Sequence, residues 1–207
     1  MPDFAFESSV AGPVAGIDEA GRGPWAGPVV AAAIVLDPAR IPDGLDDSKK
    51  LAPARREAVF PAIIDMARVG VGIGSVEEIE TLNIRGATHL AMRRAVEALG
   101  FLPRLALVDG NDKPKLPCAA ATLVRGDGLS LSIAAASIVA KVTRDRMMAV
   151  LDAAHPGYGW IRNKGYGTPE HREALERLGV TAHHRRLFAP IHKMLGYVES
   201  EDSRLNI

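Results

Sequence analysis

The most informative part of this sequence, given with its residue numbers, is Val14-Ala15-Gly16-Ile17-Asp18-Glu19-Ala20-Gly21-Arg22-Gly23. A short apolar run that closes on turn residues indicates a strand. Asp18 and Glu19 come where this run ends, so we expect them at the edge of a sheet, in front of a glycine-rich turn. Two adjacent carboxylates repel each other, and burying them unpaired costs several kcal/mol. A divalent cation would remove this cost, because magnesium and manganese prefer oxygen ligands.

Length and composition narrow the class of protein. The chain has 207 residues, of which 47% are hydrophobic, which is enough for one domain with a substantial core. Its mean hydropathy is near zero, and no apolar run reaches the roughly 18 residues that span a bilayer, so we expect no membrane partner. The N-terminus has no basic start, which argues against a signal peptide. The single cysteine, Cys118, excludes an internal disulfide and a thiolate zinc cluster, so a reducing cytoplasm is the expected location.

The net charge is zero, but the charges are unevenly distributed along the chain. Residues 1–140 hold 14 Lys or Arg against 17 Asp or Glu, whereas residues 141–193 hold 10 against 5 and five of the six histidines. A basic C-terminal third beside an acidic site fits a polyanion that one part binds and another part processes. A solvated basic face gives the same pattern, and charge alone favours that plainer interpretation.

Apolar runs alternate with helical patterns in the first half, which predicts an α/β layered domain. The predicted strands are residues 13–19, 27–36, 69–75, 105–109 and 119–124, and the first two should pair as an antiparallel hairpin. The predicted helices are residues 53–66, 85–99, 131–153 and 169–178, the last with Thr168 as its N-cap. We expect a catalytic core at residues 1–154, and a basic helical extension at residues 155–207 that forms one compact unit with it.

Two further aspartates follow predicted strands. Asp109 closes the apolar run 105–108, and Asp127 lies between two glycines before the long helix. Loops after strand ends are where α/β sheets hold ligands, so these acids could join the first two in an oxygen cage. Two metal ions about 3.5–4 Å apart can clamp the attacking and leaving oxygens of an in-line phosphoryl displacement. An isolated aspartate in a turn is usually structural, and we interpret Asp43 and Asp112 in that way.

Other residues could contact a phosphate or a sugar. The loop 21–27 nearly matches a dinucleotide fingerprint, but its last spacing is one residue too long and no P-loop is present, so we expect no cofactor nucleotide. Its glycines would instead let the backbone approach a nucleic-acid strand. Ser48 and Lys49 offer a hydroxyl and an ammonium group to phosphate, although a solvated helix start explains them equally well. Tyr166, in a glycine-rich loop, could stack on a sugar or base. The run 183–186, two histidines and two arginines, fits phosphate contact or plain exposure.

In these features the sequence resembles the bacterial ribonuclease HII family, the type 2 ribonucleases H, over nearly its whole length. The segments that carry the resemblance are Gly16-Ile17-Asp18-Glu19-Ala20-Gly21-Arg22-Gly23-Pro24, Asp47-Ser48-Lys49-Lys50-Leu51, Glu78-Ile79-Glu80-Thr81-Leu82-Asn83-Ile84, Val108-Asp109-Gly110, Gly126-Asp127, Ala134-Ala135-Ala136-Ser137-Ile138-Val139-Ala140-Lys141-Val142-Thr143-Arg144-Asp145, Lys164-Gly165-Tyr166-Gly167-Thr168 and His184-Arg185-Arg186. Leu187 departs from the pattern, because the family usually has serine before phenylalanine there.

The resemblance implies a ribonuclease H-like α/β fold, a mixed five-stranded sheet flanked by helices with a C-terminal helical extension. It implies an endonuclease that cuts the RNA strand of RNA–DNA hybrids and cuts 5′ of single ribonucleotides in duplex DNA, which removes misincorporated ribonucleotides. The products would carry 5′-phosphate and 3′-hydroxyl ends.

The same resemblance assigns roles to residues. It implies that two Mn²⁺ or Mg²⁺ ions are held by the catalytic carboxylates Asp18, Glu19, Asp109 and Asp127. It implies that the 2′-hydroxyl is read by the backbone around Gly21, Arg22 and Gly23. Tyr166 would stack on the adjacent deoxyribose, and Ser48 and Lys49 would contact phosphate.

The residues alone leave two other functions open. A non-catalytic nucleic-acid-binding module would use the basic C-terminal third, but four acids without a metal would only repel its ligand. A small-molecule phosphotransferase would use the acidic site, but it gives no reason for the basic third. We therefore expect a monomer whose partners are an RNA–DNA hybrid duplex and DNA that contains single ribonucleotides.

Overall fold

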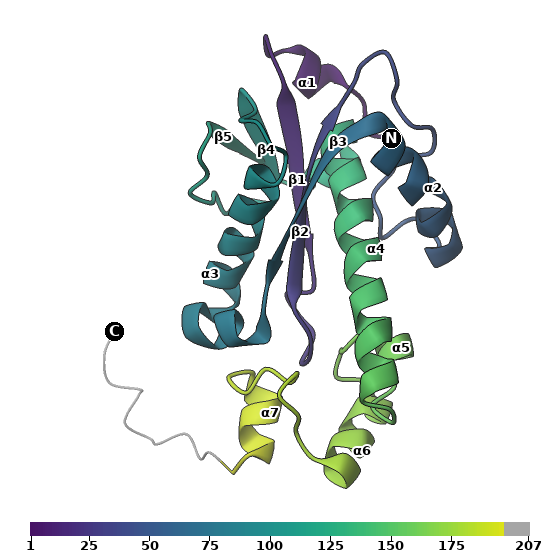
Figure 1. The fold of residues 1–207 in the computed structure, drawn as a ribbon, viewed down its shortest axis with the longest axis vertical. Coiled ribbons are helices and arrows are strands. Elements are labelled where there is room, and N and C mark those ends of the chain that lie inside the picture. The colour runs from purple at the N-terminus through teal and green to yellow at the C-terminus, as the bar shows by residue number, and fades with distance from the viewer. Residues whose placement is uncertain (197–207) are drawn as a thin grey trace. The chain divides into compact units, whose positions relative to one another are not determined.

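The computed structural model describes residues 1–196, and its strands form one mixed five-stranded sheet (Figure 1). The strand order is β3-β2-β1-β4-β5. The strands are β1 (Val14–Ala20), β2 (Val29–Leu36), β3 (Ala67–Gly74), β4 (Leu105–Asp109) and β5 (Ala120–Leu123). β1 pairs antiparallel with β2, and β2 with β3, whereas β1 with β4 and β4 with β5 are parallel pairs. The predicted hairpin and the predicted strands are confirmed, with bounds that differ by at most two residues.

One face of the sheet packs against α2 (Pro53–Met66) and α4 (Leu131–Ala154). Ala32 and Ile34 of β2 share a hydrophobic cluster with Ile63 of α2 and Ile138 of α4. Gly16 of β1 faces the same way, and a Cβ there would overlap the backbone at the start of α4. The central strand can therefore lie directly against this helix.

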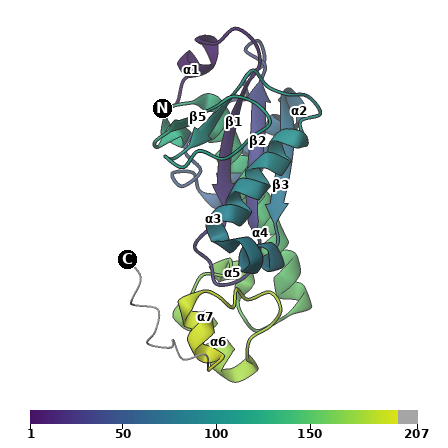
Figure 2. The ribbon, with the colours of Figure 1, turned by 90° about the vertical axis from the view of Figure 1, so that its left-hand side faces the viewer.

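The opposite face is covered by α3 (Val76–Glu97), which crosses in front of the strands in Figure 2. Gly72 and Gly74 of β3 face this helix, and side chains at either position would collide with its backbone carbonyl oxygens at Ala91 and Ala87. Because side chains alternate along a strand, the two faces of β1 also receive alternate residues. This alternation decides where the carboxylates of β1 point.

The prediction of a helix over residues 85–99 is wrong at its N-terminal end. α3 begins at Val76, after a capping box in which the Ser75 hydroxyl accepts from the N–H of Glu78 and the Glu78 carboxylate accepts from the N–H of Ser75. Asn83 interrupts the helix with φ of 58° and ψ of 173°. Its side-chain oxygen then accepts from the N–H groups of Arg85 and Gly86, which restarts the helix.

The structure also has three short helices: α1 (Ala5–Ser8) near the N-terminus, the 3₁₀ helix η1 (Gly126–Gly128) before α4, and α7 (Ala189–Met194) near the end of the described residues. Glu7 in α1 is buried, and its Oε1 accepts from the Ser130 hydroxyl at 2.6 Å and the Ser132 N–H at 2.8 Å. A carboxylate beside the first N–H groups of a helix satisfies unpaired donors and complements the helix dipole. Glu7 thereby anchors the start of α4.

The chain divides into two compact units. The sheet unit is Met1–Arg22 with Pro28–Met147, and the C-terminal unit is Gly23–Gly27 with the described residues from Met148 onward. The C-terminal unit includes α5 (Trp160–Asn163) and α6 (Pro169–Leu178), and its core contains Trp160, Met148 and Leu175. The Thr168 hydroxyl accepts from the N–H of His171, so the predicted N-cap is confirmed. Within residues 1–196, every helix is too short or too polar to cross a bilayer.

The division of the chain at residues 154 and 155, and the prediction that both parts form one compact unit, stay predictions. Residues 197–207 of the expected extension lie outside the described part of the chain.

Candidate active site

Two parallel strands bring the first acids together. Ile17 of β1 pairs with Val108 of β4, so Asp18 and Asp109 are the next residues in register on adjacent strands. Asp18 is 6% exposed, and its Oδ1 accepts from the N–H of Glu19 at 2.7 Å. Asp109 is half-buried, at the last position of β4. The parallel pairing therefore places two carboxylates side by side at one end of the sheet.

A third acid reaches the same place from η1, the turn that leads into α4. Asp127 is 5% exposed, and the N–H of the preceding Gly126 donates to Asp109 Oδ1 at 2.7 Å. A Cβ on Gly126 would overlap Cδ1 of Ile133 in α4, so a larger residue there would require the Ile133 side chain to move. Oxygen atoms of Asp18, Asp109 and Asp127, one from each, all lie within 4.8 Å of one another. We call these three residues the acidic cluster.

Burial and mutual repulsion govern the charge of the acidic cluster. Burial raises the pKa of Asp18 well above its usual value, and the negative charges of Glu19, Asp109 and Asp127 raise it further. Burial also raises the pKa of Asp109, with Asp127 as the next cause, while the Gly126 N–H acts in the opposite direction. The hydrogen-bond donors around the cluster therefore do not fully compensate its negative charge. A bound cation would stabilise the ionised carboxylates.

Glu19 points to the other face of the sheet. It lines a cavity of about 130 Å³ together with Asp109 and with Thr88 and Met92 of α3. Burial raises the pKa of Glu19, although Arg22, whose Nη1 lies 3.4 Å from Glu19 Oε1, opposes the shift. Glu19 is thus not part of the acidic cluster. Asp109 belongs to the acidic cluster and also lines the cavity that contains Glu19. The alternation of side chains along β1 accounts for this difference.

Lys49 reaches the acidic cluster, whereas Ser48 does not. Lys49 Nζ lies 3.3 Å from Asp127 Oδ2, although its side chain is 78% exposed. Partial burial lowers the pKa of the Lys49 ammonium, but Asp127 and Asp18 outweigh it, so the pKa is raised. Ser48 is buried, its N–H donates to the Ser137 hydroxyl at 3.3 Å, and its carbonyl accepts from Arg56. The phosphate contacts predicted for both residues stay predictions.

The turn after β1 is built around Gly21. Its φ is +98°, and a Cβ there would overlap the guanidinium of Arg144, which donates from Nε to the Pro28 carbonyl at 2.9 Å. Because Arg144 is buried and cannot move away, only glycine fits at this position. The adjacent Arg22 has a side chain that is 48% exposed. The backbone at Gly21 and Arg22 is consequently held in one conformation beside Glu19.

In the C-terminal unit, a rigid loop presents Tyr166. The ring is 49% exposed, and its Cε1 is 3.5 Å from the position that a Cβ on Gly23 would take. The N–H of Trp25 donates to the Gly165 carbonyl at 2.8 Å, and a Cβ on Gly167 would overlap the Trp25 ring. The predicted aromatic residue is therefore exposed while the backbone on either side of it is fixed.

Two buried histidines hold this loop, and we call His171 and His184 the histidine cluster. Nδ1 of His184 accepts from the N–H of Thr181 at 3.0 Å, so its proton is on Nε2, which lies 3.1 Å from Nε2 of His171. Nε2 of His171 also accepts from the indole N–H of Trp160 at 3.1 Å. The remaining proton of His171 is on Nδ1, which donates to the Tyr166 carbonyl at 2.9 Å. Both rings are neutral in this arrangement.

Sequence reasoning missed a group of residues beside the acidic cluster. Asp112, interpreted above as a turn residue, accepts two 2.7 Å hydrogen bonds from Arg85 and lies 3.0 Å from Nε2 of His89. The hydrogen bonds from Arg85 lower the pKa of Asp112 to about 2. Arg85 and His89 are four residues apart, on one face of α3, and both line the cavity that contains Glu19. That spacing was the one signal in the sequence that could have indicated the group.

Comparison with known proteins identifies the family. A family model described as Ribonuclease HII matches residues 15–191. The chain belongs to the ribonuclease HII family. A ribonuclease HII of Jannaschia sp. (strain CCS1) is 60% identical over 195 residues, which cover 94% of this chain and 98% of that protein.

Solved structures share the fold. The crystal structure of ribonuclease H2 from Pyrococcus horikoshii OT3 has 28% identity and a TM-score of 0.75, and the match covers 88% of this chain and 96% of that one. The RNase HII in the PCNA complex from Archaeoglobus fulgidus has 28% identity and a TM-score of 0.73, with coverage of 85% and 95%. The ribonuclease H-like fold with its mixed five-stranded sheet is therefore confirmed.

As a ribonuclease HII, this chain is a ribonuclease H endonuclease. Such an enzyme hydrolyses the RNA strand of RNA–DNA hybrids. The alternatives of a non-catalytic binding module and a small-molecule phosphotransferase are therefore wrong.

Proposed function

We propose that this ribonuclease HII also cuts duplex DNA on the 5′ side of a single embedded ribonucleotide, in addition to the RNA of hybrids. The reaction is an in-line hydrolysis that uses two Mn²⁺ or Mg²⁺ ions and leaves 5′-phosphate and 3′-hydroxyl ends. Its role is to remove ribonucleotides misincorporated into DNA, and it works as a monomer in the cytoplasm. The observation that supports the proposal is the convergence of Asp18, Asp109 and Asp127 at one end of the sheet.

The donor set fits divalent ions. Three carboxylates, two from adjacent strands and one from η1, supply oxygen ligands without thiolate or imidazole, which suits magnesium and manganese. Burial and the neighbouring carboxylates raise the pKa values of Asp18 and Asp109, so a bound cation would relieve the repulsion between these carboxylates. We assign Asp18, Asp109 and Asp127, with Glu19 on the adjoining face, as the ligands. Bound there, the ions supply an activated water at neutral pH and neutralise charge on the leaving oxygen.

The chain's own residues orient these ligands. The Gly126 N–H holds one oxygen of Asp109, and the Glu19 N–H holds one oxygen of Asp18, which leaves the second oxygen of each carboxylate available. Lys49 places a positive charge beside Asp127 in a mostly exposed position, where a phosphate oxygen of the substrate competes for it. Ser48 is assigned a phosphate contact on the weaker ground that it adjoins Lys49.

Selection of the ribonucleotide is assigned to backbone and ring contacts. The 2′-hydroxyl is the group that distinguishes a ribonucleotide from a deoxyribonucleotide. Main-chain groups around Gly21, Arg22 and Gly23 read it, and the fixed backbone at Gly21 supports this role. The exposed ring of Tyr166 stacks on the following sugar, where a second 2′-hydroxyl would clash. Recognition through sugar and backbone predicts little dependence on base sequence.

A labelled DNA duplex that contains one ribonucleotide tests the proposal. The wild-type enzyme should cut it once, 5′ of the ribonucleotide, with Mn²⁺ or Mg²⁺ and not with EDTA. Asp109→Asn should abolish cutting while binding of the duplex survives. A matched control is Asp65→Asn, which removes an exposed aspartate paired with Arg40 and should leave the rate unchanged. An uncut wild-type reaction, or cutting by Asp109→Asn at the wild-type rate, would contradict the proposal.

A further inference from the structure

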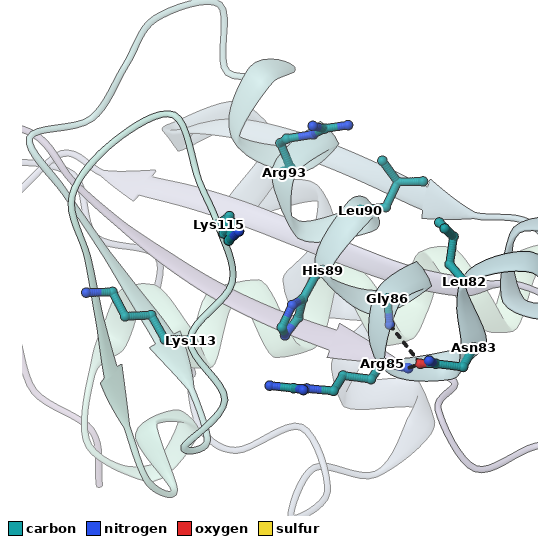
Figure 3. Close-up of a pocket in the computed structure, with 9 residues that line it drawn as sticks. All are labelled: Leu82, Asn83, Arg85, Gly86, His89, Leu90, Arg93, Lys113 and Lys115. Atoms are coloured by element: carbon teal, nitrogen blue, oxygen red, sulfur yellow. Dashed lines mark hydrogen bonds between the residues drawn. The ribbon is translucent and has the colours of Figure 1, made fainter.

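A second, larger cavity lies along α3 in the sheet unit, and we call it the basic groove. Its volume is about 550 Å³, and it runs between α3 and the loop after β4 (Figure 3). Arg85 and Arg93 come from the helix, and Lys113 and Lys115 come from the loop opposite, whereas no Asp or Glu of the described residues lines the groove. Leu82 and Leu90 of α3 also line the groove and supply apolar surface. The groove is thus strongly positive, with apolar contacts of the kind that a sugar can use.

The cationic side chains of the groove differ in whether a carboxylate pairs with them. Arg85 is bound to Asp112, and Arg93 has Glu97 as a partner at 3.7 Å, one helical turn away. Within residues 1–196, neither Lys113 nor Lys115 has a carboxylate within ion-pair distance, and both side chains are exposed. Two lysines on a loop that faces an arginine-bearing helix give a site that is short of negative charge.

The basic groove continues into the cavity beside the acidic cluster. Arg85 and His89 line both cavities, and the smaller one also contains Glu19 and Asp109. Asp112 holds Arg85 and His89 from the side of the smaller cavity. The shared wall is therefore fixed, and a chain molecule can pass from the carboxylates into the groove along it.

The restart of α3 adds to the anion preference of the groove. Asn83 and Gly86 line it where the second part of the helix begins, and Asn83 caps that helix end (Figure 3). A helix N-terminus carries partial positive charge. This contribution supplements the charges of Lys113 and Lys115.

We infer that the basic groove binds the phosphodiester backbone of the substrate strand that continues away from the cut linkage, with Lys113 and Lys115 as phosphate contacts. The inference rests on the proposed function, because it takes the carboxylates as the place of cutting. The substrate backbone extends to both sides of the cut linkage and carries one negative charge per nucleotide. Along one of these directions the groove supplies Lys113 and Lys115, which have no ion-pair partner among residues 1–196. The contacts hold backbone and sugar, so they raise affinity and not base specificity.

The test is the double variant Lys113→Gln/Lys115→Gln on a duplex with one central ribonucleotide. At about 100 mM salt we expect KM to rise about tenfold with kcat nearly unchanged, because two phosphate contacts are lost. The slope of log(kcat/KM) against log[salt] should become shallower by about 2, since each released counterion contributes about 0.9. Lys113→Arg/Lys115→Arg keeps the charges and should restore the wild-type KM.

The matched control is Arg68→Gln/Arg104→Gln. These arginines are exposed and lie at the other end of the sheet, where Arg68 pairs with Val35 and the N–H of Arg104 donates to the Pro13 carbonyl. The control removes the same two charges and should leave both KM and the salt slope unchanged. If the groove variant matches the wild type in KM and slope, the inference is wrong.

Shortened duplexes show which arm of the substrate reaches the groove. Trimming that arm should abolish the difference between wild type and variant, and a difference that survives trimming of either arm contradicts the inference. A free mononucleotide serves as competitor. If the variant loses inhibition by the mononucleotide but keeps the wild-type KM for duplex, the groove is a small-anion site and the inference is overturned.

Failure of the proposed function gives a different result. If the wild type leaves the single-ribonucleotide duplex uncut, the proposed function fails. In that case, binding of uncut duplex, measured by fluorescence anisotropy, tests separately whether the groove binds the substrate strand. Weaker binding by the glutamine variant than by the control supports the groove, and equal binding overturns it.

Discussion

The acidic cluster of the sheet unit and the histidine cluster of the C-terminal unit are both buried groups of titratable side chains, and in both the burial shifts the pKa values toward the neutral form. They differ in what surrounds each group. The carboxylate of Asp18 has other carboxylates as its nearest charges, and a single backbone N–H opposes them. His171 and His184 instead form a complete chain of hydrogen bonds from Thr181 to Tyr166.

This difference indicates that the acidic cluster is a ligand-binding site and that the histidine cluster is structural. Protonation or a cation would relieve the repulsion in the acidic cluster, because Lys49 and the backbone N–H groups compensate its charges only in part. Protonation would disrupt the histidine cluster, because each ring nitrogen already has its partner. We therefore expect changes in the first cluster to affect catalysis and changes in the second to affect stability. The following predictions test that division, in order of decreasing effect.

Asp18→Asn should have the largest effect, and it should fall on activity. We expect kcat to drop by at least about 10³-fold, the equivalent of about 4 kcal/mol, since a ligand of the proposed metal site is lost. The free energy of unfolding should stay the same or increase, because a buried like charge is removed. Single-turnover cleavage and urea unfolding measure the two quantities. A stable variant with wild-type kcat would contradict the assignment, and a large loss of stability would contradict the comparison.

His184→Ala should show the reverse pattern. The ring is fully buried and is bonded at both nitrogens, so its removal leaves a cavity and unpaired groups. We expect a loss of about 3 kcal/mol in the free energy of unfolding. Below the unfolding temperature, cleavage of a long hybrid should continue, since no carboxylate is changed. If His184→Ala were as stable as the wild type but could not cut, the cluster would be catalytic and the division wrong.

Acid should destabilise the protein through the histidine cluster. Burial lowers the pKa of His184 to about 3 and lowers that of His171, whereas an unfolded histidine titrates near 6.5. Between these values the unfolded chain binds more protons, so the free energy of unfolding falls as the pH drops below about 6.5. The slope approaches about 1.4 kcal/mol per pH unit for each histidine. Urea unfolding at a series of pH values should give a flatter profile for His184→Ala, and parallel profiles would contradict this.

The smallest effect concerns the helix that carries His171. Thr168→Ala removes the N-cap of α6 and should cost about 1 kcal/mol. Ser75→Ala, which removes the N-cap of α3, is the matched change in the sheet unit and should cost a similar amount. Thermal unfolding of both variants measures the costs. A loss of several kcal/mol in Thr168→Ala alone would mean that the cap and the histidine cluster act as one unit.

Much of the fold was predictable because it depends on local patterns. Apolar runs with turn residues at their ends gave all five strands, and Pro53 and Thr168 marked the starts of two helices. The first part of α3 was missed although Ser75 and Glu78 form a readable capping box, because Asn83 interrupts the helical period. The short α1 and α7 gave no usable pattern, since a helix of one or two turns depends on its tertiary contacts.

The candidate site was predictable only as a set of residues. Strand ends and glycines indicated the acids, but the opposite direction of Glu19 follows from the side-chain alternation along β1, which the prediction did not use. The hydrogen bond between Arg85 and Asp112 joins residues 27 positions apart in the sequence, and the one between His171 and His184 joins residues 13 positions apart. Such contacts depend on how the elements pack, so neither group could be derived from spacing alone.

The acidic cluster is proposed to bind divalent ions because its negative charges are compensated only in part. Titration of the free enzyme with Mn²⁺, followed by electron paramagnetic resonance, tests this proposal most directly. We expect the wild type and His184→Gln to bind Mn²⁺ alike and Asp127→Asn to bind it much more weakly. Undiminished binding by Asp127→Asn, or loss of binding in His184→Gln, would contradict the account.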